Sequence, residues 1–279
     1  MDFYQKYNAL LALIVDSGNI ARTYFDANNK QHEQKNDGSV VTEIDTNIET
    51  MLLSFVREHF PGDEIRGEEH GTHAGTTGYV WHIDPIDGTD NFLRKIPFCG
   101  VSVARLGPTD EGSFGIIYNP ITRQMFTSLE GSAVGENEHV CTLTAESLGG
   151  RFAVSIGRGK SESWMRPACY ALLSALGMKY GKSGTYGSTA LELAYVAANR
   201  IDAFLTYGLK SYDYAAGLYM VRAGCGAISV CNDGIWKLWE GNIKDLCSEH
   251  GRTIFVSHPD VHAEVLAFIG DPKKWAEKI

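Results

Sequence analysis

The segment WHIDPIDGTDNF, at residues 81–92, constrains the fold of this chain more than any other stretch of the sequence. An apolar, strand-like run leads into Asp84, and Pro85 fixes φ and disfavours helix immediately before it. The chain then turns, and Gly88 can open a short helix. A strand that ends in such a turn brings the carboxylates of Asp84 and Asp87 toward one point in space.

The helix start beside these carboxylates has free backbone N–H groups, which suit an anion. We expect Mg²⁺ to bridge Asp84 and Asp87 to a phosphate group, because Mg²⁺ takes few carboxylates, keeps several waters and accepts substrate oxygens. The backbone carbonyl of Ile86 offers one more oxygen ligand. The alternative is structural, because a pair of aspartates in this setting would equally well cap a helix and close a turn.

Two further acidic residues are candidates for the same site. Glu68 follows a strand-like run shortly before residues 81–92, and neighbouring strands would place it close to Asp84. Asp213 opens a segment rich in small residues, which would let a helix approach the site closely. Taken singly, Glu68 is read more simply as a solvated surface charge and Asp213 as a helix N-cap.

Apolar residues at helical spacing predict two helices near the N-terminus, at residues 3–25 and 42–59. Asp45 lies three residues after Thr42, at the start of the second helix. This spacing alone favours a capping box over a catalytic role for Asp45.

Short strand-like runs between Gly, Pro, Asn and Asp turns fill the middle of the chain and predict an antiparallel sheet. From about residue 146, strands and helices alternate. We therefore predict an α/β (α+β) protein with two halves that share one extended interface. The first half, residues 1–147, would carry the N-terminal helices, the antiparallel sheet and the main metal site, and residues 148–279 would complete the site.

The composition excludes several classes of partner. The net charge is −9 and no run is rich in Lys or Arg, so the sequence predicts neither nucleic acid nor membrane as a partner. Six cysteines without a C-x-x-C pair favour reduced thiols and a cytoplasmic protein. The apolar run near the N-terminus has helical spacing, which indicates a packed helix rather than a signal peptide.

Three motifs together carry a family resemblance: GEE at residues 67–69, WHIDPIDGTDNF at 81–92 and YDYAAG at 212–217. They resemble the signatures of the inositol monophosphatase family, a group of Mg²⁺-dependent, lithium-sensitive phosphatases. The resemblance extends over nearly the whole chain. It implies a layered α/β/α/β/α sandwich of the inositol monophosphatase and sugar phosphatase type, and usually a homodimer.

The same resemblance assigns roles to individual residues. Two or three Mg²⁺ ions would be held by Glu68, Asp84, the carbonyl of Ile86, Asp87 and Asp213. Among the catalytic groups, Glu68 would help to activate a water, Thr89 would bind that water and Asp45 would pair with Thr89. The substrate would be contacted by Asp87, Gly88, Thr89, Thr189, Thr206 and Asp213, with the N–H groups of Gly88 and Thr89 on the phosphate.

The implied function is hydrolysis of a small phosphorylated alcohol by metal-activated water, with inositol 1-phosphate as the first candidate substrate. Thr206 stands where inositol-cleaving members carry a glutamate, and Tyr212 replaces a tryptophan. GLKSYD, at 208–213, resembles the histidinol-phosphatase branch. Fructose 1,6-bisphosphate and adenosine 3′,5′-bisphosphate are further candidates.

Two rival interpretations remain. A haloacid-dehalogenase-type phosphatase also carries a D-x-D-G-T motif, but here two residues separate the aspartates. A catalytically idle metal-binding scaffold would be marked by a missing ligand, and none of the expected ligands is missing.

Overall fold

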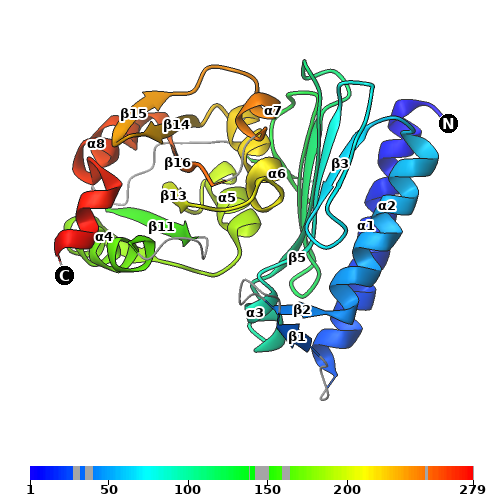
Figure 1. Ribbon diagram of the computed structural model, residues 1–279, viewed down its shortest axis with the longest axis horizontal. Coiled ribbons are helices and arrows are strands. Elements are labelled where there is room, and N and C mark those ends of the chain that lie inside the picture. The colour runs from blue at the N-terminus through cyan, green and yellow to red at the C-terminus, as the bar shows by residue number, and fades with distance from the viewer. Residues whose placement is uncertain are drawn as a thin grey trace.

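The computed structural model describes residues 1–27, 32–34, 40–137, 139–141, 151–158, 164–248 and 251–278. Two long helices, α1 (Phe3–Asp26) and α2 (Glu43–His59), lie side by side and form the outermost layer of the first half (Figure 1). Asp2 caps α1 by accepting a hydrogen bond from the N–H of Gln5 at 2.8 Å. The two expected N-terminal helices are therefore present.

An eight-stranded sheet packs against these helices, with the strand order β10-β9-β8-β7-β6-β5-β3-β4. Its strands are β3 (Glu64–Gly67), β4 (Thr72–His73), β5 (Val80–Asp87), β6 (Gly100–Leu106), β7 (Phe114–Asn119), β8 (Gln124–Leu129), β9 (Gly135–Glu136) and β10 (His139–Val140). A two-stranded ribbon, β1 (His32–Gln34) and β2 (Val40–Thr42), precedes α2, and the short helix α3 (Thr89–Leu93) follows β5.

The first sheet is antiparallel, as expected, except where β3 runs parallel to β5. After β4 turns back along β3, the chain returns to the starting end of β3 before β5 begins. The N–H of Thr76 donates to the carbonyl of Gly62 at 2.7 Å, and the N–H of Glu64 donates to that of Tyr79 at 3.0 Å. Because of this return, the parallel strands β3 and β5 end on the same side of the sheet. Glu68, which follows β3, therefore lies near Asp84.

A six-stranded mixed sheet forms the second half, with the order β12-β11-β13-β16-β14-β15. Its strands are β11 (Phe152–Arg158), β12 (Gly181–Gly184), β13 (Ala203–Tyr207), β14 (Ala227–Asn232), β15 (Ile235–Leu238) and β16 (Thr253–Ser257). Its helices are α4 (Met165–Tyr180), α5 (Thr189–Ala197), α6 (Ser211–Ala223), α7 (Ile243–Leu246), α8 (Pro259–Ile269) and the 3₁₀ helix η1 (Pro272–Lys278).

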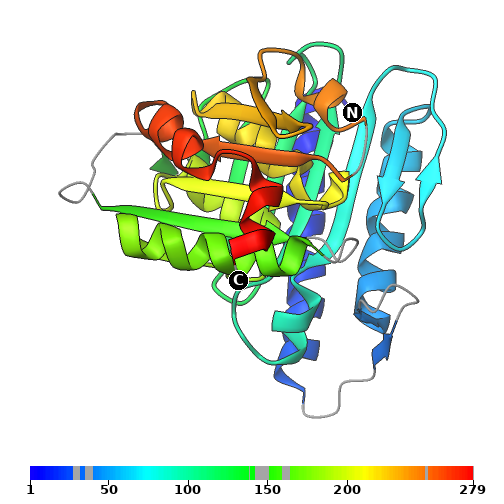
Figure 2. The same cartoon turned by 60° about the vertical axis from the view of Figure 1, so that its left-hand side comes forward.

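The helices and sheets alternate in five layers (Figure 1). From one side to the other these are α1 with α2, the eight-stranded sheet, α5 with α6, the six-stranded sheet, and α4 with α8. Figure 2 shows α4 and α8 covering the outer face of the second sheet. Three clusters of buried apolar side chains fill the spaces between the layers. The predicted α/β/α/β/α sandwich is thus confirmed.

The predicted division at residues 147 and 148 lies outside the described residues, so it stays a prediction. Within the part of the chain that is described, none of the helices combines the length and the apolar character needed to span a membrane.

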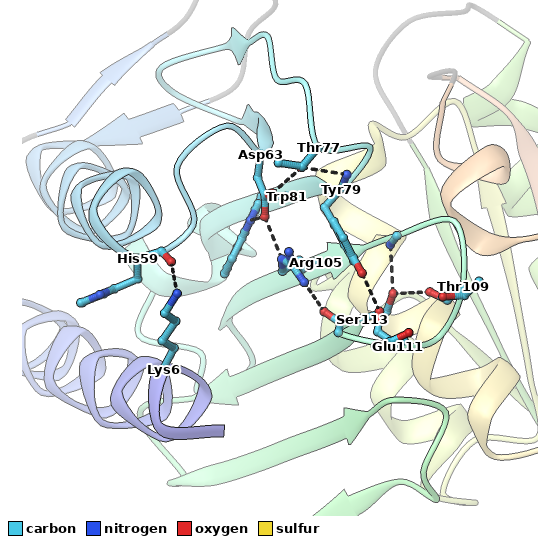
Figure 3. A network of polar contacts seen from close by, with 12 residues as sticks. Lys6, His59, Asp63, Thr77, Tyr79, Trp81, Arg105, Thr109, Glu111 and Ser113 are labelled. Carbon is cyan, nitrogen blue, oxygen red and sulfur yellow. Dashed lines mark hydrogen bonds and ion pairs between the residues drawn. The ribbon is translucent and has the colours of Figure 1, made fainter. Parts of the chain in front are cut away.

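A buried polar network fixes the start of β5 (Figure 3). Asp63 accepts hydrogen bonds at 2.9 Å from the indole of Trp81 and at 2.8 Å from the guanidinium of Arg105. Asp63 and Arg105 are each 7% exposed, and the guanidinium also lies 3.6 Å from the ring centroid of Tyr79. Removing either charge would leave the other buried and unpaired. The network therefore holds in register the strand whose far end carries Asp84 and Asp87.

Candidate metal centre

A β-bulge turns Asp84 and Asp87 toward the same site. Side chains three residues apart on a regular strand point to opposite faces. Here Asp84 is opposite Ser102 and Asp87 is opposite Gly100, so three steps on β5 match two steps on β6. The extra residue lies in the stretch that contains Pro85, which a bulge accommodates. The strand thus continues through the motif instead of ending at Asp84.

Asp213 joins these two aspartates from the second half of the chain. One carboxylate oxygen from each of Asp84, Asp87 and Asp213 lies within 4.8 Å of the others. Asp213 lies in the first turn of α6, where it accepts a hydrogen bond from the N–H of Lys210 at 2.8 Å. Lys210 is the N-cap and Asp213 is the third residue of the helix, so the simpler interpretation of Asp213 as the N-cap is wrong.

Small residues bring α6 close to its neighbours, as the sequence indicated. A Cβ added at Gly217 would lie 2.3 Å from the side chain of Leu193 on α5, and one added at Gly115 would lie 2.7 Å from the carbonyl of Ala216. His82 on β5 forms a hydrogen bond of 3.0 Å with the hydroxyl of Ser211, at the start of α6. These contacts fix Asp213 beside the end of β5.

The electrostatics of the cluster favour cations. Burial raises the pKa of Asp84 well above its usual range, and the charges of Glu68, Asp87 and Asp213 raise it further. Burial is also the main reason that the pKa of Asp213 is raised, followed by the charges of Asp87 and Glu68. Glu68 thus lies close enough to act on every aspartate of the cluster. Such a set of oxygen donors repels itself without a cation and matches the ligands that Mg²⁺ prefers.

Asp87 is also tied to the second half of the chain. Its carboxylate accepts hydrogen bonds from the hydroxyl of Ser188 and, at 2.8 Å, from the N–H of Ala190 at the start of α5. Burial raises the pKa of Asp87 to about 7, although these hydrogen bonds oppose the rise. Ser188 was not among the predicted site residues. Its position before an apolar helix marks it as an N-cap, but the sequence does not reveal that it contacts Asp87.

The turn from β5 into α3 depends on glycine at position 88. Gly88 has φ of +89°, and a Cβ there would lie 2.9 Å from the carbonyl oxygen of Gly187. The hydroxyl of Thr89 donates to the carbonyl of Ile86 at 3.1 Å. The carbonyl proposed as a metal ligand and the hydroxyl proposed to bind water therefore lie next to one another.

Asp45 forms the capping box that its spacing predicts. It is fully buried and accepts hydrogen bonds from the N–H of Thr42, at 2.9 Å, and from the Thr42 hydroxyl. Burial raises the pKa of Asp45 to about 7. Among the described residues, its Oδ1 atom has no hydrogen-bond partner, while the Thr89 hydroxyl donates to Ile86. The predicted pairing of Asp45 with Thr89 is not formed here and stays a prediction.

Besides Thr89, the two other threonines predicted to contact the substrate differ in position. Thr189 is the first residue of α5, and its N–H is directed at Asp87, next to the cluster. Thr206, in contrast, is 0% exposed within β13. Its hydroxyl donates to the carbonyl of Arg252 at 3.4 Å and accepts from the N–H of Ile254 at 3.3 Å. The structure thus corrects the expected role of Thr206, because its hydroxyl is used within the sheet and is shielded from a ligand.

Comparison with known proteins decides the family. The sequence model of the inositol monophosphatase family matches residues 4–268. The chain belongs to the inositol monophosphatase family. The resemblance inferred from the three motifs is therefore confirmed, and the four acidic residues described above stand in that family's fold.

Curated relatives in this family carry the name Nus factor SuhB. Those of Salmonella typhimurium and Escherichia coli K12 are each 32% identical to this chain over 230 residues, which covers 80% of this chain and 84% of the relative. Among solved structures, the Thermotoga maritima IMPase has a TM-score of 0.80 and 24% identity, with coverage of 98% of this chain and 99% of that chain. An inositol monophosphate-bound SaIMPase-II, from Staphylococcus aureus, has a TM-score of 0.74 at 20% identity, with 98% and 96% coverage.

One expectation from composition is wrong. The acidic net charge predicts no nucleic-acid partner, yet the relatives at 32% identity are named Nus factor SuhB. The physical reason is that net charge speaks only to direct attraction to the phosphate backbone. It does not exclude a place in the nucleic-acid machinery that is reached through protein contacts.

Proposed function

We propose that this chain is a Mg²⁺-dependent phosphomonoesterase that hydrolyses a small phosphorylated alcohol. One observation carries the proposal: carboxylates from β5 and α6, distant in sequence, meet within 4.8 Å beside Glu68. Because burial and mutual repulsion disfavour this set without a cation, its assembly is best explained by metal binding. Membership of a phosphatase family supports the same reaction class.

In this proposal, Glu68, Asp84, Asp87, Asp213 and the carbonyl of Ile86 hold two or three Mg²⁺ ions. When bound, Mg²⁺ supplies the positive charge that activates water and stabilises the leaving oxygen of the phosphate ester.

Residues of the turn and of α5 orient the reactants. The Thr89 hydroxyl donates a hydrogen bond to the carbonyl of Ile86, so its oxygen can accept a hydrogen bond from the attacking water. One oxygen of Asp45 has no hydrogen-bond partner in the part of the chain that the structure describes, and it would take up a proton or pair with Thr89. The N–H groups of Gly88 and Thr89 would bind the phosphate, and the backbone of Thr189 would contact the alcohol.

Inositol 1-phosphate is the first candidate substrate, and histidinol phosphate is the main alternative. The burial of Thr206 removes one polar contact that a polyhydroxylated substrate would use. The test is phosphate release from inositol 1-phosphate, histidinol phosphate, fructose 1,6-bisphosphate and adenosine 3′,5′-bisphosphate, ranked by kcat/KM. The proposal predicts turnover of at least one ester that EDTA abolishes and Mg²⁺ restores. Hydrolysis that persists in EDTA, or a complete lack of it on the whole panel, would refute the proposal.

A second candidate function comes from the curated relatives named Nus factor. We propose, as the alternative, that the chain acts in transcription, with or without phosphatase activity. Purified RNA polymerase transcribing with and without the protein provides the test. An effect kept by Asp87→Asn would separate this function from catalysis.

The oligomeric state and the compartment are also proposals. Family habit favours a homodimer, and the free cysteines among the described residues fit the reducing cytoplasm. Light scattering after size-exclusion chromatography measures the first of these directly.

A further inference from the structure

A buried glutamate on α2 contacts the turn that carries Glu68. Glu49 is 0% exposed and lies one helical turn after Asp45, on the same face of the helix. No motif or expected role singles it out in the sequence. A charged side chain buried this completely requires hydrogen bonds to compensate for the loss of water.

Within the described ranges, those hydrogen bonds come from the two residues that follow Glu68. One oxygen of Glu49 accepts from the N–H of Glu69 at 2.8 Å. The other accepts from the N–H of His70 at 2.8 Å and lies 3.2 Å from the His70 ring nitrogen Nδ1. Hydrogen bonds to a charged acceptor are about twice as strong as those between neutral groups. The carboxylate of Glu49 therefore anchors the turn after Glu68 to α2.

The residue before Glu68 shows how closely the parts fit. A Cβ added at Gly67 would lie 2.1 Å from one carboxylate oxygen of Glu49, a distance that no real contact allows. The N–H of Gly67 donates to Gly71 at 2.9 Å, and the N–H of Glu68 donates to Ile83 on β5 at 3.1 Å. The backbone of Glu68 is thus bonded to β5, and the two residues after it are bonded to Glu49.

We propose that Glu49 is a positioning residue, which holds Glu68 against the carboxylates of Asp84, Asp87 and Asp213 so that the metal centre is complete. This inference rests on the proposed function, because Glu68 is proposed there as a ligand. The physical need is clear from the charges. Like charges push Glu68 away from the cluster, and a turn that ends a strand would yield without an anchor.

Binding of Mn²⁺, followed by electron paramagnetic resonance, tests the proposal without reference to activity. Glu49→Gln keeps the shape of the side chain but loses the charge that accepts both N–H groups. We expect Mn²⁺ affinity to fall about 10- to 100-fold, the usual loss when a partner of a metal ligand is removed. Glu58→Gln is the matched control, since Glu58 is an exposed glutamate on the same helix. Its Mn²⁺ affinity should equal that of the wild type.

A double-mutant cycle separates positioning from general damage. If Glu49 acts through Glu68, adding Glu49→Gln to Glu68→Gln should weaken Mn²⁺ binding little further. Two independent full losses would overturn the proposal, as would wild-type affinity in a folded Glu49→Gln variant. Should Glu49→Gln fail to fold, Gly67→Ala decides, because its Cβ displaces the same carboxylate. Weaker Mn²⁺ binding by Gly67→Ala then supports the proposal, and unchanged binding overturns it.

Failure of the positioning role of Glu49 can be told apart from failure of the proposed phosphatase function. A wild-type protein that binds Mn²⁺ but hydrolyses no phosphate ester would end the enzymatic proposal and leave the cycle interpretable. A wild-type protein that hydrolyses an ester, together with an unaffected Glu49→Gln variant, would end the positioning role alone.

Discussion

Replacing Asp87 with asparagine should stabilise the metal-free protein and should abolish the proposed phosphatase activity in Mg²⁺. A carboxyl group whose pKa rises from 3.8 to about 7 on folding favours the protonated form in the folded state. Stability from this group is therefore complete below pH 3.8 and is lost as the pH rises toward 7. The loss at pH 7 amounts to about 4 kcal/mol, because each tenfold change in proton affinity is worth about 1.4 kcal/mol.

The substitution also weakens favourable contacts. The hydroxyl of Ser188 and the N–H of Ala190 both donate to Oδ2 of Asp87, and an asparagine oxygen in that place can accept both. Because that oxygen is uncharged, the two weaker hydrogen bonds together cost roughly 2 kcal/mol. The net gain expected at pH 7 is about 2 kcal/mol. For a chain of this length that corresponds to an increase in Tm of roughly 3 °C.

Urea unfolding in EDTA and in Mg²⁺, at pH 5 and pH 8, measures the effect. In EDTA at pH 8 the variant should be more stable than the wild type, and the difference should shrink at pH 5. Mg²⁺ should stabilise the wild type strongly and the variant weakly. Asp90→Asn is the matched control, since Asp90 is an exposed neighbour paired with Arg94. A variant less stable than the wild type in EDTA at pH 8 would refute the reasoning.

Further predictions concern other parts of the fold. Gly88→Ala should lower the free energy of unfolding by about 1–2 kcal/mol and reduce the proposed phosphatase activity. The reason is that φ of residue 88 is +89° and the carbonyl of Gly187 occupies the place of a Cβ. Equal urea midpoints for the variant and the wild type would contradict this. Arg105→Lys should cost about 3 kcal/mol in the same assay, since Asp63 would lose its planar partner. Burial lowers the pKa of His262 to about 4, so its contribution to stability is present above pH 6.5 and is lost as the pH falls toward 4. That loss, about 3 kcal/mol, should vanish in His262→Gln.

Much of the metal centre could be predicted because its main motif is contiguous. Asp84 and Asp87 are three residues apart, and Gly88 directly after them marks the turn into α3. The bulge could not be predicted, because it depends on how β5 pairs with β6. Without it, strand periodicity alone would send the two carboxylates to opposite faces.

Contacts between segments that are distant in the chain could not be predicted from the sequence. Ser188 can be recognised as an N-cap, but only the folded position of the start of α5 beside the end of β5 shows that its hydroxyl reaches Asp87. In the sequence, Glu49 is one of several charges on an amphipathic helix. Only the fold shows that the turn after Glu68 donates hydrogen bonds to it. Thr206 shows the converse error, because alignment with a motif suggested a substrate contact and the sheet buries the side chain.

The central claim is that these carboxylates gather divalent cations to hydrolyse a phosphate ester. Anomalous diffraction from crystals soaked in Mn²⁺ and phosphate tests it most directly. The account predicts anomalous peaks in contact with Asp84, Asp87 and Asp213, with a phosphate oxygen on the same ions. A difference map without any peak among these side chains, in crystals where Mn²⁺ is seen elsewhere, would contradict the account.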